Sequence, residues 1–307
     1  MKQTLTWTLL VALFAFGSCN NRPEKVRQQA DFGRLEYIDD FRSQHFPVRD
    51  LLVWLPEDYN PAERYAVLYM HDGQMLFDEH TSWNKQSWNV DSVATAVQRD
   101  GRCRPFIVVG IENHPENRLT EYMPQRLLEY VPADNGQLAA YGRENFIADG
   151  YLKMIVEELK PLIDSRYSTL TDAANTAVMG SSMGGLISLY ALCEYPEVFG
   201  AAGCLSTHSP VALGNFEVEA PIWSKAFRDY LTDHLPPVEK NRVYMDYGDR
   251  TIDEGYAPFQ KQIDSLFVAK GWGAEHFTTR FFAGHAHDER SWQERLHEPL
   301  EWIFGRE

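Results

Sequence analysis

The amino-acid sequence predicts an α/β fold, a mostly parallel twisted sheet of about eight strands with helices on both faces. Three observations support this prediction. Short β-rich runs alternate with segments whose apolar residues recur at spacings of three and four. Two more strand-like runs precede the alternating series. The composition, 44% hydrophobic and 24% charged over 307 residues, is typical of a chain with a sizeable core, so one large domain is expected.

The first two strands are expected at residues 35–37 and 48–55, where residues alternate or run apolar. The turn-forming residues Pro56, Asp58 and Asn60 follow the second run. This arrangement indicates an antiparallel pair at the start of the chain's folded part.

The rest of the chain alternates between strands and helices. Strands are expected at residues 65–70, 106–111, 176–179, 201–205, 243–247 and 278–282. Helices are expected at residues 88–98, 146–162, 184–194, 257–270 and 292–304. The long stretches 72–88, 113–142 and 207–237 are expected to be loops that shape a site at the carboxyl ends of the strands.

The N-terminal residues are expected to be a secretion signal rather than part of the fold. Lys2 precedes an apolar run over residues 5–16, which is shorter than the roughly 20 residues of a membrane-spanning helix. Gly17 and Ser18 supply the small residues that a signal peptidase needs. Residues 1–18 are therefore expected to be a signal peptide.

The residues around Cys19 resemble the lipobox of bacterial lipoproteins, in which such a cysteine is lipidated. Phe16 stands where a leucine is usual, so soluble secretion is the alternative. Residues 19–33 are expected to be the lipidated N-terminus and a flexible tether, and residues 34–307 the folded domain. The expected location is a bacterial cell envelope, in the periplasm or at the outer membrane, with membrane contact through the lipid anchor only.

Charge and cysteine usage exclude several classes of protein. Lys plus Arg number 29 against 44 Asp plus Glu, a net charge of −15, and no basic stretch is present, so a nucleic-acid partner is excluded. Cys193 and Cys204 lie in apolar runs and are expected to be buried thiols, whereas Cys103, between two arginines, is expected to be exposed. Without Cys19 an odd number of cysteines remains, which argues against a disulfide framework.

Residues 178–185 read Val-Met-Gly-Ser-Ser-Met-Gly-Gly and contain Gly-x-Ser-x-Gly between a predicted strand and a predicted helix. A nucleophilic serine needs its hydroxyl raised on a strained turn, and flanking glycines let the strand and the helix approach each other. Ser182, rather than Ser181, is therefore the expected nucleophile. A glycine-rich turn that merely begins a helix is the alternative.

Five further segments match one family in their order along the chain. They are residues 71–77 (His-Asp-Gly-Gln-Met-Leu-Phe), 121–124 (Glu-Tyr-Met-Pro), 158–164 (Glu-Leu-Lys-Pro-Leu-Ile-Asp), 195–199 (Tyr-Pro-Glu-Val-Phe) and 287–289 (His-Asp-Glu), with Trp292 and Arg295 after them. With the serine motif, they make the chain from residue 48 onward resemble the α/β-hydrolase family called "Putative esterase" or esterase D, which also holds enterochelin esterases, feruloyl esterases and mycolyltransferases. The resemblance implies an α/β-hydrolase fold and an ester-cleaving enzyme.

The general base is expected after the nucleophile, because triads on this fold run Ser, then Asp or Glu, then His. His285 and His287 follow the strand predicted at 278–282, in a loop whose small residues leave room for an imidazole. The resemblance favours His287, since His-Asp-Glu followed by Trp292 matches the family segment. His285 is the alternative base; in a purely structural role it would hydrogen-bond a neighbouring carbonyl and hold the loop.

The acid of the triad is expected on the loop after the strand predicted at 243–247, which carries Asp249 and Asp253. Spacing alone does not separate two carboxylates on one loop. The resemblance favours Asp253, because Thr-Ile-Asp before Tyr256 matches the corresponding family segment. Asp249 is the alternative, and the aspartate outside the triad is expected to cap a helix or to pair with Arg250 at the surface.

Metal catalysis is the competing interpretation. Residues 285–288, His-Ala-His-Asp, place two imidazoles and a carboxylate within four residues, as metal ligands also do. A hydrolytic metal site needs ligands from several strands, and His71 with Asp72 is the only other obvious cluster in the sequence. Because a metal site would leave the serine motif unexplained, neither a metal nor another cofactor is expected.

Two backbone amides are expected to form the oxyanion hole. One belongs to Met183, the residue after the nucleophile. The other belongs to Gln74, in the loop after the first parallel strand, where Gly73 permits a tight turn. The side chain of Gln74 is the alternative donor.

Substrate contacts are expected from the long loops. Trp88 is expected to reach substrate, with burial in the core as the alternative. Arg118 is expected to hydrogen-bond a ligand oxygen, or else to pair with Glu121. The net negative charge favours neutral ligands over anionic polymers.

Together these features predict a serine carboxylic-ester hydrolase that works through an acyl-enzyme on a small-molecule or oligosaccharide ester. Removal of acetyl or feruloyl groups from carbohydrate is the leading expectation. The alternatives are an acyltransferase, a siderophore or thioester hydrolase of the same fold, and a catalytically inactive family member that binds glycan.

Overall fold

The computed structural model describes residues 26–212 and 216–306, so the expected signal peptide and Cys19 lie outside the described residues. Within this part of the chain, one eight-stranded sheet has the order β1-β2-β4-β3-β5-β6-β7-β8. Its strands are β1 (Arg34–Phe41), β2 (Arg49–Leu55), β3 (Ala66–His71), β4 (Phe106–Ile111), β5 (Thr176–Ser181), β6 (Ala201–Leu205), β7 (Arg242–Tyr247) and β8 (Phe277–Phe281).

The strand directions confirm the predicted fold class. β1 and β2 form the expected antiparallel pair, and β2 also pairs antiparallel with β4. The six strands from β4 to β8 in sheet order pair in parallel. Their carboxyl ends therefore lie at one edge of the sheet, where sites form in folds of this class.

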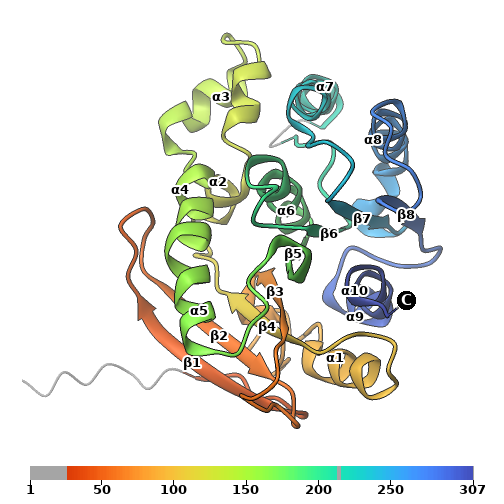
Figure 1. Cartoon of the computed structure of the whole chain (residues 1–307). Coiled ribbons are helices and arrows are strands. Elements are labelled where there is room, and N and C mark those ends of the chain that lie inside the picture. Colours follow the sequence, from red (N-terminus) through yellow and green to blue (C-terminus); the bar gives the residue numbers. More distant parts are fainter. Residues whose placement is uncertain (1–25, 213–215, 307) are drawn as a thin grey trace, which may run out of the picture.

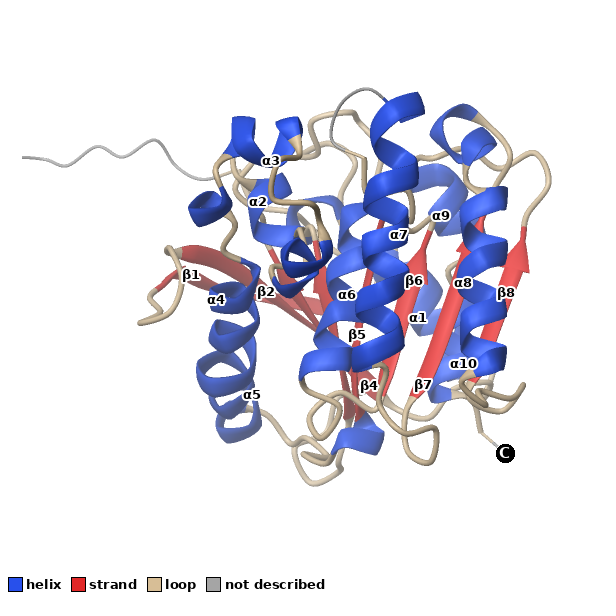
Figure 2. Ribbon diagram, turned by 90° about the horizontal axis from the view of Figure 1, so that it is seen from above, coloured by secondary structure: helices blue, strands red, loops and turns tan. Residues whose placement is uncertain are grey.

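Helices cover both faces of the sheet (Figures 1 and 2). One face carries α1 (Val90–Arg99), α9 (Glu289–Arg295) and α10 (His297–Phe304). The other face carries α2 (Arg118–Tyr122), α4 (Ala148–Lys153), α5 (Lys160–Arg166), α6 (Met183–Glu194), α7 (Phe216–His234) and α8 (Ala257–Ala269). α3 (Gly136–Tyr141) lies farther out, beyond α2 and α4 in Figure 1.

Two hydrophobic clusters fill the spaces between the sheet and these helices. In β3, Val67 and Tyr69 belong to the cluster under α4 to α8, whereas Leu68 and Met70 belong to the cluster under α1 and α10. Successive side chains of a strand point to opposite faces, so a sheet covered on both sides needs apolar residues at every position. This requirement explains the continuous apolar runs of the central strands.

Several helix boundaries differ from the prediction. The stretch 207–237, expected to be a loop, contains the 19-residue helix α7. Its buried Trp223, Phe227 and Leu231 recur at spacings of four, a signal that Pro221 within the helix obscures. The helix expected at 292–304 is two helices, α9 and α10, and the one expected at 146–162 continues to Arg166 through a π-helical segment (Met154–Leu159).

The prediction for Cys103 is wrong, because its side chain is buried. Cys103 lies in an extended segment that bridges Gly305, and its thiol donates to the carbonyl of Leu300 at 3.4 Å. The flanking Arg102 and Arg104 alternate away from it, as neighbours in extended backbone do. Burial raises the pKa of the Cys103 thiol to about 12.

Residues 26–33, expected to be part of a flexible tether, pack against the domain. The amides of Asp31 and Phe32 donate to one oxygen of Asp91 at 2.7 and 3.1 Å. Trp54 Nε1 donates to the carbonyl of Phe32 at 2.8 Å. This segment is therefore a folded strap.

No helix of residues 26–212 and 216–306 is long and apolar enough to cross a membrane.

Candidate active site

Ser182 stands on a strained turn between β5 and α6. Its φ is 59° and its ψ is −120°, a backbone conformation that residues other than glycine rarely adopt. The amide of Ser182 donates to Leu205 O at 2.9 Å, and its carbonyl accepts from His208 N at 3.2 Å. A Cβ at Gly180 would lie 2.8 Å from the backbone of Gly184, so the motif's glycines allow the close approach of strand and helix.

His287 and Asp253 form a hydrogen-bonded pair. His287 Nδ1 lies 2.7 Å from Asp253 Oδ1, and both side chains are buried. Since the carboxylate accepts from Nδ1, the neutral imidazole keeps Nε2 free to accept a proton. The backbone amide of His287 donates to Thr251 Oγ1 at 2.9 Å, which holds the histidine loop against the aspartate loop.

The surroundings of Asp253 favour its ionised form. Its second oxygen, Oδ2, accepts from Ser206 Oγ at 2.6 Å and from the amide of Gly248 at 2.7 Å. Burial by itself raises the pKa of this carboxyl, but the hydrogen bonds from His287, Ser206 and Gly248 outweigh it and lower the pKa. Asp253 therefore remains a carboxylate that orients His287.

Ser182 and His287 line one cavity of about 660 Å³, whereas Asp253 lies behind the histidine. The other residues that line this cavity come mostly from the long loops and the start of α9: Asp72, Gln74, Met75, Thr81, Trp83, Asn84, Trp88, Asn113, Pro115, Arg118, Ser181, Ile252, Asp288, Glu289 and Trp292. The structure thus brings the expected nucleophile and base to one hollow at the carboxyl edge of the sheet.

The alternative base and acid lie in structural contacts instead. His285 Nδ1 donates to Ser291 O at 3.3 Å, the loop-holding role weighed for it from the sequence. Asp249 accepts from the amide of Gly284 at 2.7 Å, and its other neighbour is Arg250 at 3.6 Å. Within residues 26–212 and 216–306, no three His, Cys, Asp or Glu side chains form a group suited to a metal ion.

One expected oxyanion donor, Met183, follows Ser182 in the chain, and the other, Gln74, lines the same cavity. Met183 is the first residue of α6, where a helical amide has no partner within the helix. Gln74 lies in the 3₁₀ turn Gly73–Met75 and lines the cavity. A Cβ at Gly73 would lie 2.8 Å from the carbonyl carbon of Ile111, so the turn's approach to β4 requires glycine. The side-chain oxygen of Gln74 accepts from the amide of Asn113 at 3.2 Å.

Arg118 lies in the cavity wall but pairs with a different acid from the one expected. Its Nε and Nη2 each donate to Asp72 at 2.7 Å, whereas Glu121 pairs with Arg49. Burial by itself raises the pKa of the Asp72 carboxyl, but the Arg118 guanidinium and the hydrogen bond from Asn113 outweigh it and lower the pKa. Arg118 therefore enters the cavity with its charge compensated.

Three tryptophans line the cavity, Trp83, Trp88 and Trp292, and they differ in exposure. Trp88, the expected substrate contact, is only 2% exposed and packs on Trp292 with ring centroids 5.4 Å apart. Trp83, in the preceding loop, is 80% exposed. Trp223, in α7, is buried and does not line this cavity.

Three polar residues that the sequence reasoning did not select support the triad. Ser206, with φ 40°, bonds Asp253 and accepts from Trp292 Nε1 and Arg295 Nη2 at 3.0 and 2.7 Å. Its place directly after β6 was the available signal, because polar residues at strand ends often serve sites. The other two residues, His208 and Tyr256, lie behind the nucleophile.

His208 and Tyr256 form a second hydrogen-bonded pair at the nucleophile. His208 Nε2 lies 3.1 Å from the carbonyl of Ala212 and must donate to it, so Nδ1 accepts from the Tyr256 hydroxyl at 2.8 Å. Burial lowers the pKa of His208, which favours this neutral tautomer. The pair lies beside the nucleophile, because the backbone amide of His208 donates to the carbonyl of Ser182 at 3.2 Å.

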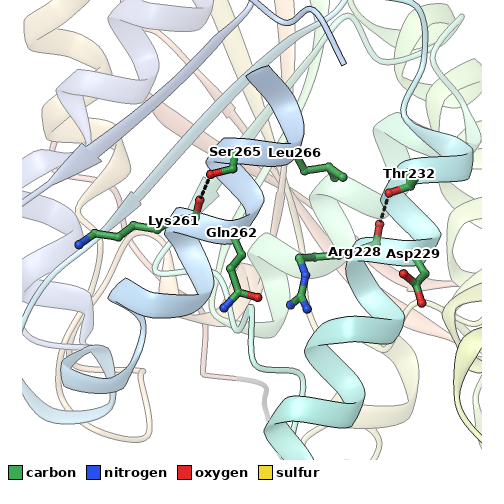
Figure 3. Close-up of a pocket in the computed structure, with 7 residues that line it drawn as sticks. All are labelled: Arg228, Asp229, Thr232, Lys261, Gln262, Ser265 and Leu266. Carbon is green, nitrogen blue, oxygen red and sulfur yellow. Dashed lines mark hydrogen bonds between the residues drawn. The ribbon is translucent and has the colours of Figure 1, made fainter. Parts of the chain in front are cut away.

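A second hollow, of about 580 Å³, lies between α7 and α8 (Figure 3). Its lining residues are Arg228, Asp229, Thr232, Lys261, Gln262, Ser265 and Leu266. The hydroxyls of Thr232 and Ser265 donate to carbonyls of their own helices, at 2.7 and 2.8 Å. Since no histidine faces these hydroxyls in the lining, the arrangement suited to nucleophilic catalysis belongs to the Ser182 cavity.

Comparisons with known proteins agree with the eight-stranded α/β fold described above. The model of the family described as "Putative esterase" matches residues 48–303. The chain is 24% identical to protein YbbA of Bacillus subtilis over 84% of this chain and 93% of that one. It is 25% identical to an endo-1,4-beta-xylanase/feruloyl esterase of Xylanibacter ruminicola, over 91% of this chain and 32% of that protein.

Among solved structures, the enterobactin esterase of Shigella flexneri, determined in the presence of enterobactin, superposes with a TM-score of 0.64. The two chains are 20% identical, and the match covers 90% of this chain and 60% of that chain. This likeness shows a common fold.

Proposed function

This chain belongs to the esterase family, a family of carboxylic-ester hydrolases, and from that premise we propose that it cleaves its ester through an acyl-enzyme formed on Ser182. One observation supports the proposal above all others. His287, hydrogen-bonded to Asp253 at 2.7 Å, lines the same cavity as Ser182, which lies on a strained turn.

In the first half of the reaction, Ser182 Oγ attacks the ester carbonyl carbon and its proton passes to His287 Nε2. Asp253 holds the tautomer and stabilises the imidazolium that results. The amides of Gln74 and Met183 donate to the oxyanion. The tetrahedral intermediate then expels the alcohol, which takes the proton from His287, and the acyl group stays on Ser182.

In the second half, His287 takes a proton from a water that attacks the acyl-enzyme. The bond to Ser182 Oγ breaks, the carboxylic acid leaves, and Oγ recovers its proton. If an alcohol replaces water in this step, the same residues transfer the acyl group instead, so transfer is a second outcome of the same mechanism.

The lining of the cavity supports a neutral substrate with an aromatic or sugar component. Asp288 and Glu289 contribute carboxyl groups, and the cation Arg118 is already paired with Asp72. Exposed Trp83 offers an aromatic face. With the feruloyl esterase activity named for the Xylanibacter relative, these features favour feruloyl or acetyl esters of carbohydrate. The likeness to enterobactin esterase makes an aromatic siderophore ester the second candidate.

The test is a panel of chromogenic short-chain esters, acetylated and feruloylated xylo-oligosaccharides and an aromatic siderophore ester. Wild type and Ser182→Ala are compared, with and without EDTA. Hydrolysis by wild type that survives EDTA and disappears in the variant is expected. Loss of activity with EDTA would support metal catalysis instead, and binding of the oligosaccharides without turnover would support an inactive glycan binder. Products extended by an added alcohol would identify a transferase.

A further inference from the structure

The N-terminal strap, residues 26–33, reaches the turn that carries one oxyanion donor. Hydrogen bonds hold it on the domain. Tyr37 and Trp54 donate hydrogen bonds to carbonyls of the strap, and two amides of the strap donate to Asp91. Tyr37 Oη donates to the carbonyl of Gln28 at 2.7 Å, which fixes the backbone from which the Gln28 side chain projects.

The side chain of Gln28 is buried and spans the oxyanion turn. Its Nε2 donates to the carbonyl of Gly73 at 2.9 Å, and its Oε1 accepts from the amide of Phe77 at 3.0 Å. The residue is only 7% exposed. Both halves of its amide group are thus satisfied by backbone groups in and just after the Gly73–Met75 turn, 45 and 49 residues away in sequence.

The carbonyl that Gln28 binds belongs to the same peptide group as the Gln74 amide. A trans peptide is planar, and its C=O and N–H point in opposite directions. No cis peptide is present in the described residues. A hydrogen bond that fixes the Gly73 carbonyl therefore also fixes the direction of the N–H of Gln74, a residue that lines the cavity.

We propose that Gln28 is a positioning residue for the oxyanion hole, holding the Gln74 N–H toward the developing negative charge. The inference rests on the proposed esterase function. It gives one residue of the strap, Gln28, an indirect role that acts through Gln74 without contact with the substrate.

The expected effect follows from this indirect role. Removing an oxyanion donor costs about 10² to 10³ in rate, and a donor that is only less well oriented costs less. Loss of the Gln28 amide is expected to lower kcat about 10-fold, with KM within about twofold, because the donor matters most in the transition state.

The experiment compares Gln28→Met, which keeps the side-chain volume, with Gln29→Met in the full chain. Gln29 is the matched control, because it is exposed and its hydrogen bond to Asp78 comes from the backbone amide, which the substitution keeps. The readouts are kcat, KM and the inhibition constant of an alkyl boronic acid, whose tetrahedral adduct with Ser182 mimics the oxyanion. Gln28→Met is expected to weaken boronic acid inhibition by the same factor as it lowers kcat/KM, and Gln29→Met to leave both unchanged.

A second variant covers the case in which Gln28→Met does not fold, as judged by circular dichroism. Tyr37→Phe removes the bond to the Gln28 carbonyl and is expected to show a smaller loss of the same kind. Equal boronic acid affinity and kcat in wild type and these variants would overturn the inference alone. A wild-type protein that neither hydrolyses esters nor binds the boronic acid would refute the proposed function and, with it, this role.

Discussion

His287 Nδ1 and Asp253 Oδ1 are 2.7 Å apart, although the two residues come from different loops, 34 positions apart in the chain. The aspartate follows β7 and the histidine follows β8, so parallel neighbouring strands bring their loops to the same edge. Ser182 follows β5, which runs parallel to β7 and β8 with β6 between them, so it reaches the same edge of the sheet.

Replacing the nucleophile or the base is expected to abolish turnover. Ser182→Ala and His287→Ala should each lower kcat by about 10⁴ to 10⁶, because the groups act as a unit. His285→Ala is the matched control and should retain activity near wild type, since His285 contacts Ser291 O. Steady-state hydrolysis of a chromogenic ester, with circular dichroism for folding, checks this. Abolished turnover in His285→Ala with an active His287→Ala would reverse the assignment of the base.

Asp253→Asn is expected to lower kcat, but less than Ser182→Ala, because the serine and the imidazole remain. Asp249→Asn is the control on the same loop. An asparagine there can still accept from the amide of Gly284, so kcat should change by no more than a few-fold. A larger loss in Asp249→Asn than in Asp253→Asn would assign the acid to Asp249.

Ser206→Ala is expected to impair the orientation of Asp253. The change removes the 2.6 Å hydrogen bond to Oδ2, leaves Trp292 Nε1 without its acceptor and leaves Arg295 Nη2 with Asp246 alone, so a loss of about 1 to 3 kcal/mol of stability accompanies it. A fall in kcat of about 10-fold is expected from the less constrained base.

The control for this change is Ser209→Ala, because Ser209 Oγ bonds only Thr207 O among the described residues. Thermal unfolding and kcat are measured for both variants. If the two variants had the same kcat, Ser206 would have no part in holding Asp253.

The Asp72–Arg118 pair makes stability depend on pH. Because the folded protein lowers the pKa of Asp72 below its ordinary value of 3.8, the carboxylate's contribution is complete above that value and is lost as pH falls through the lower, folded-state pKa. Asp72→Asn is expected to cost about 1 to 3 kcal/mol near neutral pH.

The difference in the free energy of unfolding between wild type and Asp72→Asn should stay constant down to about pH 5 and become smaller below about pH 4. Urea unfolding at a series of pH values measures it. A difference that grew on acidification would show that the pKa of Asp72 is raised in the folded state.

Cys19→Ser tests the envelope anchor expected from the sequence. The serine variant should lose labelling by a radioactive or clickable fatty acid and leave the membrane fraction of expressing bacterial cells. Membrane association equal to that of the wild type, without label in either, would contradict lipidation at Cys19.

Contiguous sequence was enough to predict most of the fold. The sheet strands, α1, α6 and α8 are encoded by local periodicity, and the Gly-x-Ser-x-Gly motif placed Ser182 on its turn because all the residues that shape that turn are neighbours in the chain. The long helix α7 was missed because an internal proline obscured an otherwise regular apolar spacing.

Contacts between distant segments were decided by the tertiary structure alone. Asp249 and Asp253 share one loop, and only the 3₁₀ turn Thr251–Gly255, entered through a positive φ at Thr251, points Asp253 toward His287 and Ser206. Gln28 meets Gly73, and Ser206 meets Asp253, across 45 and 47 residues. Such pairings leave no local pattern, because a hydrogen bond between loops depends on where the sheet carries each strand end and not on spacing along the chain.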